Sequence, residues 1–306
     1  MLRPPGEHEV DAVAALVNAL SQSLYGDDAV TTDEVRRWFT SPTGDRERDF
    51  RVAELPDGRL GGVGSIADVA EDHSLIWLHV ALHPELGTEQ MGKELLAAGE
   101  RRARERAAAG ARIHAGTPSR DERAARLLEA HGYRLVRHFF RMLIAFDAAP
   151  PEPVWPPGFE LRAFDVERDT ERVWAADHEA FEDHWGFVRV GLEEWRHWMT
   201  TGEHFDPALW FIAYDGDEIA GFSLCRPRES GDPDMGWVSV LGVRRPWRRR
   251  GLALALLRHS FVELHRRGKK RVGLGVDAEN TTGALRLYER AGMHVDRRWD
   301  TWEKIV

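Results

Sequence analysis

Hydrophobic and polar residues follow helical and strand spacings in an order that occurs twice along the chain. Each half begins with two helical segments and continues with three strands: residues 7–40, 50–55, 60–67 and 75–82 in the first half, and 165–200, 209–214, 218–226 and 235–243 in the second. Turn residues at 56–59 and 215–217 join the first two strands of each set, as expected for hairpins. The pattern therefore predicts two similar arrangements of helices and strands.

Both halves also end alike, with a long helix, a strand, a shorter helix and a last strand. The long helices are predicted at 91–109 and 252–267. Gly92 and Ala253, at matching positions of these helices, are 161 residues apart, and Gly132 and Gly292, which end the shorter helices, are 160 residues apart. Such a period indicates a duplicated domain, because solenoid repeats are shorter and more numerous.

A proline-rich segment separates the two halves. Residues 148–158 hold five of the fifteen prolines, which favours an extended and fairly stiff linker. We therefore predict an N-terminal domain over 1–147, a linker over 148–158 and a C-terminal domain over 159–306, both domains of the α/β (α+β) class.

Composition and charge narrow the possible functions. A chain of 306 residues with 42% hydrophobic residues can fill two cores, and its net charge of −9 argues against a nucleic-acid partner. Its apolar runs fall short of the roughly 20 residues that a membrane helix needs, so no membrane partner is expected. The single cysteine, Cys225, is interpreted as a small core residue and fits the reducing cytoplasm. The oligomeric state stays open between a monomer and a homodimer.

The richest chemical signal lies between residues 237 and 253. A strand ends at Val243, a basic turn with Arg248, Arg249 and Arg250 follows, and a helix begins near Gly251. Free N–H groups at a helix N-terminus bind phosphate, and a glycine lets a diphosphate approach the backbone. The arginines alone are typical of a solvated surface. However, cations at a helix N-terminus are unfavourable without an anion, which favours an anion site. The dinucleotide pattern G-x-G-x-x-G is absent.

The pattern Arg-x-x-Gly-x-Ala at 248–253, after the strand Val-Leu-Gly-Val at 240–243, resembles the acetyl-CoA loop of the GCN5-related N-acetyltransferases (GNAT family). The match continues through residues 276–280 and 284–293, which end in Leu-Tyr-Glu-Arg-Ala-Gly-Met and resemble the family's fourth helix with its L-Y-x-x-x-G-F ending. The resemblance covers about 159–306. It implies two tandem GNAT-like domains, each a mostly antiparallel mixed sheet with a splayed strand pair and helices on both faces.

The resemblance also implies a site for acetyl-CoA and no metal. Backbone groups of Leu241, Gly242 and Val243 would pair with the pantetheine arm, and the N–H of Val243 would donate to the thioester carbonyl. The diphosphate would bind at the loop, formed by Arg248, Arg249, Arg250, Gly251, Leu252 and Ala253. Asn280 matches a position whose side chain reaches the pantetheine. Tyr288 matches the general acid that protonates the CoA thiolate; by its pattern alone it would be interpreted as a core aromatic residue.

The sequence offers several candidates for the group that takes the proton from the attacking amine. Some relatives place a glutamate on the strand before the loop, and Trp237 stands at that position here. Glu182, Asp183 and His184, near the end of the first helix of the second half, are candidates for the base or the acceptor site. A capped helix end is the alternative interpretation of this cluster. Asp234 and His204 are weaker candidates.

The matching loop of the first half, residues 83–92, has lost these features. At the 161-residue offset, Gly87, Thr88 and Glu89 stand where the three arginines stand in the second half. At the 160-residue offset, Leu128 takes the place of Tyr288. A carboxylate where a diphosphate would bind is an electrostatic conflict. We therefore predict that the N-terminal domain is a catalytically degenerate copy with a structural role.

Together these features predict a cytoplasmic, acetyl-CoA-dependent N-acetyltransferase. It would move an acetyl group to a primary amine of a small molecule by direct attack on the thioester. The alternatives are a protein or peptide N-acetyltransferase and a non-catalytic acyl-CoA-binding sensor or scaffold. The intact loop and Tyr288 argue against the sensor.

Overall fold

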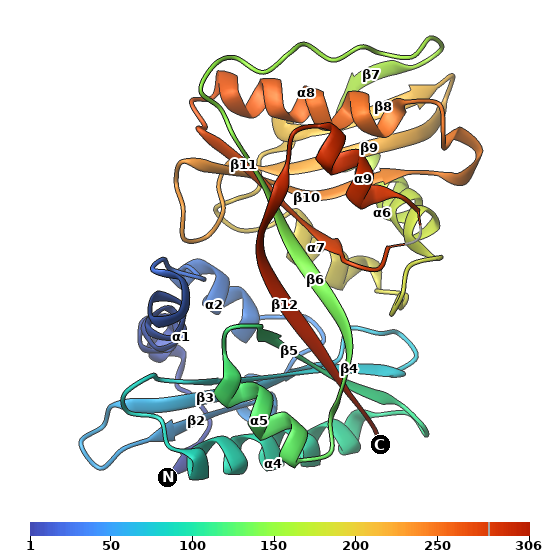
Figure 1. The fold of residues 1–306 in the computed structure, drawn as a ribbon. Helices are drawn as coiled ribbons and strands as arrows, with labels where there is room; N and C mark the ends of the chain where they lie inside the picture. The colour runs from blue at the N-terminus through green and yellow to red at the C-terminus, as the bar shows by residue number, and fades with distance from the viewer. Residues whose placement is uncertain (281) are drawn as a thin grey trace. The chain divides into compact units, whose positions relative to one another are not determined.

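A computed structural model describes residues 1–280 and 282–306, and Figure 1 labels its elements. The first half contains β1 (Leu2–Arg3), α1 (Val10–Tyr25), α2 (Thr32–Phe39), α3 (Arg46–Asp49), β2 (Phe50–Glu54), β3 (Leu60–Ala67), β4 (Leu75–Leu82), α4 (Glu89–Arg106), β5 (Arg112–Pro118), α5 (Glu122–Ala130) and β6 (Arg134–Ala145). The second half contains β7 (Glu160–Ala163), α6 (Val166–Phe181), α7 (Leu192–Met199), β8 (Trp210–Asp215), β9 (Glu218–Arg226), β10 (Met235–Val243), α8 (Leu252–Arg266), β11 (Arg271–Asp277), α9 (Ala284–Arg290) and β12 (His294–Ile305). The predicted elements are confirmed in order and type; β1, α3 and β7 were not predicted.

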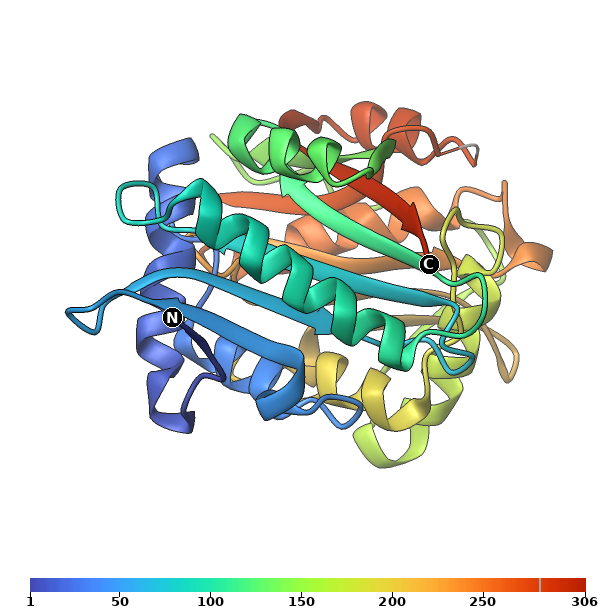
Figure 2. The ribbon, with the colours of Figure 1, turned by 90° about the horizontal axis from the view of Figure 1, so that it is seen from below.

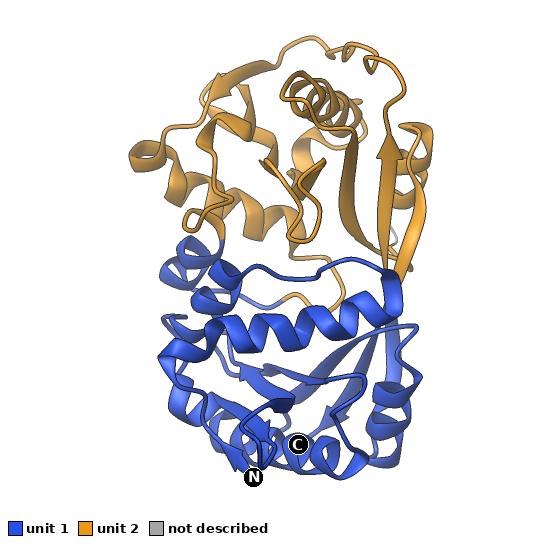
Figure 3. Ribbon diagram, turned by 90° about the vertical axis from the view of Figure 1, so that its left-hand side faces the viewer, with its two compact units in different colours: residues 1–138, 188–198, 299–306 blue, residues 139–187, 199–298 orange. Residues whose placement is uncertain are grey.

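The chain forms two compact units that interleave the two halves of the sequence (Figure 3). Unit 1 contains residues 1–138, 188–198 and 299–306, and unit 2 contains 139–187 and 199–298. Most of β6 therefore belongs to unit 2, and most of β12 belongs to unit 1. The domain limits of 147 and 159 stay a prediction about the repeated sequence.

The sheet of unit 1 has the order β1-β2-β3-β4-β5, with the end of β12 added beside β5. Its pairs are antiparallel except β4 and β5, which run parallel and pair only from Leu75↔Arg112 to Leu78↔Ala115. A Cβ at Gly62 or Gly64 would contact Leu95 of α4, which runs across the sheet in Figure 2. Helix α1 packs with Val52 and Val63 instead. Helices thus cover both faces.

Unit 2 repeats this architecture with the order β7-β8-β9-β10-β11-β6. The parallel strands β10 and β11 pair only from Met235↔Arg271 to Val238↔Leu274 and then separate. Beyond that point β11 continues beside β6, up to Asp277↔Phe139. This is the splayed strand pair that the family resemblance implied, and the fold class is confirmed.

The exchanged strands contribute to the cores of the units that receive them. Met142 of β6 is fully buried beside Val272 and Leu274 in the core of unit 2. Trp302 of β12 lies in the core of unit 1, where its indole N–H donates to Thr117 Oγ1 at 3.1 Å. Each half therefore completes its sheet with a strand from the other half.

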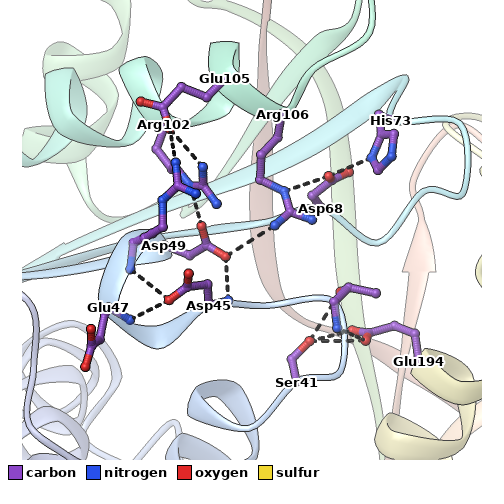
Figure 4. A network of polar contacts seen from close by, with 12 residues as sticks. Ser41, Asp45, Glu47, Asp49, Asp68, His73, Arg102, Glu105, Arg106 and Glu194 are labelled. Carbon is purple, nitrogen blue, oxygen red and sulfur yellow. Dashed lines mark hydrogen bonds and ion pairs between the residues drawn. The ribbon is translucent and has the colours of Figure 1, made fainter.

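Helix α7 is held in unit 1 by a buried carboxylate. Glu194 is only 2% exposed and accepts hydrogen bonds from Ser41 Oγ at 3.0 Å and from the Thr43 N–H at 3.2 Å (Figure 4). The indole N–H of Trp198 donates to the same carboxylate at 2.6 Å. Because removing a partner of a buried charge is costly, these bonds fix α7 firmly in unit 1.

A second network ties α4 to its own sheet. Asp49 accepts from Arg102 Nε at 2.6 Å, and Asp68 accepts from Arg106 Nε at 2.8 Å and contacts His73 Nδ1 at 2.8 Å (Figure 4). Both carboxylates are buried, so the arginines offset their desolvation.

Among the residues described, no helix is long and apolar enough to span a membrane.

Candidate active site

Strand β10 has a free edge at the positions predicted to hold the pantetheine. Its register against β9 shifts between Val238 and Val240, which makes Ser239 the extra residue of a β-bulge. Pairing with β11 has ended by this point. The N–H groups of Leu241 and Val243 and the carbonyl of Leu241 are therefore free on the β11 side to pair with an extended ligand, as in strand addition, while the Val243 carbonyl accepts from Arg248.

The turn after β10 exposes a row of backbone donors. Arg249 has φ +62° and Gly251 has φ +87°, and a Cβ at Gly251 would meet nothing within 4 Å. In the described part of the chain, the N–H groups of residues 249–253 have no hydrogen-bond acceptor. These N–H groups open α8, where the helix dipole favours an anion. A left-handed non-glycine costs about 1–3 kcal/mol, a strain that is typical of ligand-binding turns.

The three arginine side chains of this turn point to different partners. Arg248 donates from Nε to the Val243 carbonyl at 3.1 Å and from Nη2 to the Ala180 carbonyl at 2.9 Å. Arg250 lies 3.7 Å from the Asp215 carboxylate and 4.6 Å above the Phe159 ring. Arg249 is exposed and forms no ion pair among the residues described. That all three guanidinium groups contact a diphosphate stays a prediction.

The candidates Glu182, Asp183 and His184 differ in their contacts. Glu182 lies 2.8 Å from Arg245, and Asp183 accepts from Arg245 Nε at 2.9 Å. The hydrogen bonds from Arg245, with Arg248 adding to them, hold the pKa of the Asp183 carboxyl below its usual range. Both carboxylates are paired with Arg245, and the lowered pKa makes Asp183 a poor proton acceptor.

His184 has the properties of a neutral base. Its ring packs edge-on against Phe181, with the centroids 4.6 Å apart. Burial lowers the pKa of the imidazole, and the charge of Arg248 lowers it further. A neutral imidazole at physiological pH can accept a proton.

Tyr288 lies on α9, in the core of unit 2. Burial raises the pKa of its phenol to about 12, so the hydroxyl keeps its proton. Asn280 accepts a hydrogen bond from the Thr282 N–H at 2.8 Å, which uses the carbonyl oxygen and leaves the amide nitrogen for a ligand. The neighbouring Thr281 lies outside the described residues.

Comparison with known proteins identifies the family of this fold. The model of the acetyltransferase (GNAT) family matches residues 166–293. A mycothiol acetyltransferase from Thermobispora bispora is 32% identical over 230 residues, which cover 72% of each chain. The chain belongs to the GNAT family. It is an N-acetyltransferase.

Solved GNAT structures share the architecture of the whole chain. A GCN5-related N-acetyltransferase from Sphaerobacter thermophilus has a TM-score of 0.79 and 32% identity, covering 100% of this chain and 95% of that chain. A tandem GNAT protein from the clavulanic acid biosynthesis pathway has a TM-score of 0.74 at 17% identity, covering 100% of this chain and 98% of that chain. The tandem GNAT layout is therefore confirmed.

This GNAT protein has a tryptophan where some relatives carry a strand glutamate. The ring of Trp237 lies over Gly273, where a Cβ would come within 2.7 Å of it.

The two weaker candidates for the base contact other side chains. Asp234 pairs with Lys270 at 2.8 Å, and the buried His204 accepts from Arg228 at 3.4 Å. Cys225 is buried, as its sequence context predicted.

Sequence reasoning missed two aromatic side chains near the splayed strands. Phe139 comes from the exchanged β6, and its ring lies 6.3 Å from that of Trp185. Phe181 lies under the backbone of Gly242, where a Cβ would be 3.2 Å from its ring. The glycine at 242 in a strand was the available signal for Phe181. No local signal links Phe139 to the second half.

The matching turn of unit 1 uses several of its backbone donors internally, among them the N–H groups of Met91 and Gly92, which donate to Thr88 at 3.2 and 3.1 Å. His83 Nδ1 accepts from the N–H groups of Glu85 and Leu86 at 3.2 and 3.3 Å, and Arg123 donates to the Gly87 carbonyl at 2.6 Å. Strand β4 also pairs with β3 in one continuous register, without the bulge of β10. The cavity between β4, β5 and α5 measures only about 20 Å³, the space of about one water molecule. These internal bonds and the carboxylate of Glu89, which stands at the position of Arg250, make the turn a poorer site for a diphosphate than its counterpart in unit 2.

Proposed function

We propose that this protein transfers the acetyl group of acetyl-CoA to a primary amine of a small molecule. The observation that carries the proposal is the row of free N–H groups at residues 249–253, directly after the free edge of β10. The diphosphate of acetyl-CoA would lie on the N–H groups, and its pantetheine arm would pair with residues 241–243. A strand edge followed by a helix N-terminus suits a ligand in which an extended arm is joined to a diphosphate.

The transfer requires no covalent enzyme intermediate. The amine nitrogen attacks the thioester carbon, and the N–H of Val243 donates a hydrogen bond to the oxygen as it gains negative charge. The new C–N bond forms and the C–S bond breaks, which leaves CoA as a thiolate. Tyr288, still a phenol, donates its hydrogen bond and proton to that sulfur, and His184 accepts a proton from the amine. Most of the rate enhancement then comes from positioning.

Similarity to mycothiol acetyltransferases makes a mycothiol precursor with a free amine the first acceptor to test. The paired state of Glu182 and Asp183 supports an acceptor that does not depend on those two carboxylates. Trp185 and His184 instead offer aromatic faces, which suit the apolar body of an amine or a sugar ring.

We also propose that the N-terminal copy binds no acetyl-CoA. Two observations support this: the internal hydrogen bonds of its turn, and the carboxylate of Glu89 at the position where Arg250 stands in the second half. Calorimetry with CoA should then give one site per chain. A second site of similar affinity would contradict this proposal.

The experiment measures release of free thiol from acetyl-CoA with a panel of amines: a mycothiol precursor, amino sugars, amino-acid derivatives and short peptides. We expect turnover on at least one small amine and a loss of about 10²-fold or more in kcat for Tyr288→Phe. Turnover on peptides alone would favour the protein N-acetyltransferase. Binding of acetyl-CoA without any turnover would favour the sensor, and no binding at all would reject the proposed function.

A further inference from the structure

The CoA-binding turn is joined to the segment that carries His184. Arg248 uses its planar guanidinium to reach three groups: the Val243 carbonyl at 3.1 Å, the Ala180 carbonyl at 2.9 Å and the Asp183 carboxylate at 3.3 Å. These groups lie at the end of β10, at the end of α6 and in the following loop. Because the donors of a guanidinium have a fixed geometry, one side chain sets the relative positions of all three.

Two further sets of contacts join β10 and its turn to the segment that carries His184. Arg245, at the start of the turn, contacts both Glu182 and Asp183. Beneath the strand, Phe181 lies against Gly242 and also against the ring of His184. A displacement of the end of β10 or of the turn therefore displaces His184.

Arg248 differs from the exposed ion pairs around it in the kind of acceptor that it contacts. The pair between Arg245 and Glu182 is about half exposed on both sides, and such pairs contribute little in water. Two of the three acceptors of Arg248 are backbone carbonyls, which cannot turn away as a side chain can. In the first half, Pro84 and Gly87 stand at the positions of Arg245 and Arg248, so the degenerate copy has neither arginine.

We propose that Arg248 couples the two substrate sites, as a positioning residue that transmits acetyl-CoA binding to the acceptor segment, residues 181–187. The inference rests on the proposed function. A diphosphate on the N–H groups of residues 249–253 holds the turn in its strained conformation, with Arg249 at φ +62°. The turn then holds Arg248, and Arg248 holds Ala180 and Asp183. The acceptor meets an ordered segment, so each substrate tightens the binding of the other.

Hydrogen–deuterium exchange on the full chain, with and without saturating CoA, tests this coupling without a known acceptor. In the wild type, CoA should slow exchange at 249–253 and also at 181–187, where the N–H groups of His184 and Phe187 already donate to local carbonyls. Arg248→Lys keeps the charge but loses the planar fork. We expect it to keep the protection at 249–253 and to lose that at 181–187.

Arg266→Lys is the matched control, because Arg266 lies at the far end of α8, outside the proposed CoA-binding turn, and contacts Glu152 and Glu263. It should keep both regions of protection at saturating CoA. With an active acceptor, Arg248→Lys should raise the acceptor KM by about 5-fold or more at saturating acetyl-CoA, while its affinity for CoA alone, measured by calorimetry without acceptor, should stay within about twofold of wild type.

Two results would overturn the coupling while leaving the proposed function intact. One is CoA protection confined to 249–253 in the wild type. The other is unchanged protection of 181–187 in Arg248→Lys. If CoA fails to bind the wild type at all, the proposed function falls, and the coupling falls with it.

Discussion

Burial acts in opposite directions on the pKa values of His184 and Tyr288. It lowers the pKa of the imidazole and raises that of the phenol to about 12, because each buried site disfavours the charged form. His184 is therefore neutral, and Tyr288 is protonated, over the same physiological range of pH. One can accept a proton while the other donates one, which a single transfer step requires.

At the scale of the residue, we predict that the pKa of His184 lies below that of an ordinary histidine. NMR titration should place it below the ordinary value of about 6.5 for histidine. A base with a lowered pKa is active at neutral pH and loses activity as the pH falls through that value. His184→Gln should remove this acidic limb and lower kcat by about 10²-fold or more. A titration at or above the ordinary value would contradict the role of His184.

Gly251→Asp tests the diphosphate site. The carboxylate would lie beside the free N–H groups, where it would compete with the diphosphate and repel it, so calorimetry should detect no CoA binding. Gly268→Asp is the control, since Gly268 follows the other end of α8 and has φ +82°, and a Cβ there, as at Gly251, would meet nothing within 4 Å. Both variants carry the same backbone strain, but Gly268→Asp should bind CoA as the wild type does.

At the scale of elements, the sequence predicts the features that depend on residues close together in the chain. The turn at 248–251 could be found from sequence because Gly251 and the helix start lie within a few residues. The contacts of Arg248 could not, since Ala180 lies 68 residues earlier in the chain. The partners of β6 and β12 could not be found from sequence either. The hydrophobic pattern predicts both strands, but β5 and β11 have similar edges, so either edge could accept either strand. Strand alternation cannot choose between two edges of one repeat.

Because the end of β12 pairs with β5, a residue near the C-terminus should stabilise the sheet of unit 1. Trp302→Ala removes a buried indole from the core of unit 1 and should cost about 3–5 kcal/mol in the free energy of unfolding. Hydrogen exchange at β5 should accelerate. Val295→Ala, on the same strand but 46% exposed, should change stability little. Acceleration at β11 rather than β5 would contradict the strand assignment.

The whole molecule depends on both halves for each of its units. Without β6, the edge of β11 from Arg271 to Asp277 has no partner, and Met142 is missing from the core that holds Tyr288. Without residues 299–306, β5 loses its outer neighbour in the same way. Unpaired edges of this length invite aggregation. The N-terminal half, which we propose to be catalytically degenerate, is therefore still required, because it supplies part of the fold on which the proposed CoA-binding turn depends.

Division of the chain in the linker tests this dependence. Residues 159–306 expressed alone lack β6, so we expect them to be insoluble or to unfold cooperatively at much lower denaturant, with no CoA binding by calorimetry. Coexpression with residues 1–158 should restore a stable complex that binds CoA with nearly the affinity of the intact chain, because each fragment carries the strand that the other needs. If residues 159–306 alone bind CoA as tightly as the full chain does, β6 is dispensable, and the N-terminal half must have another role.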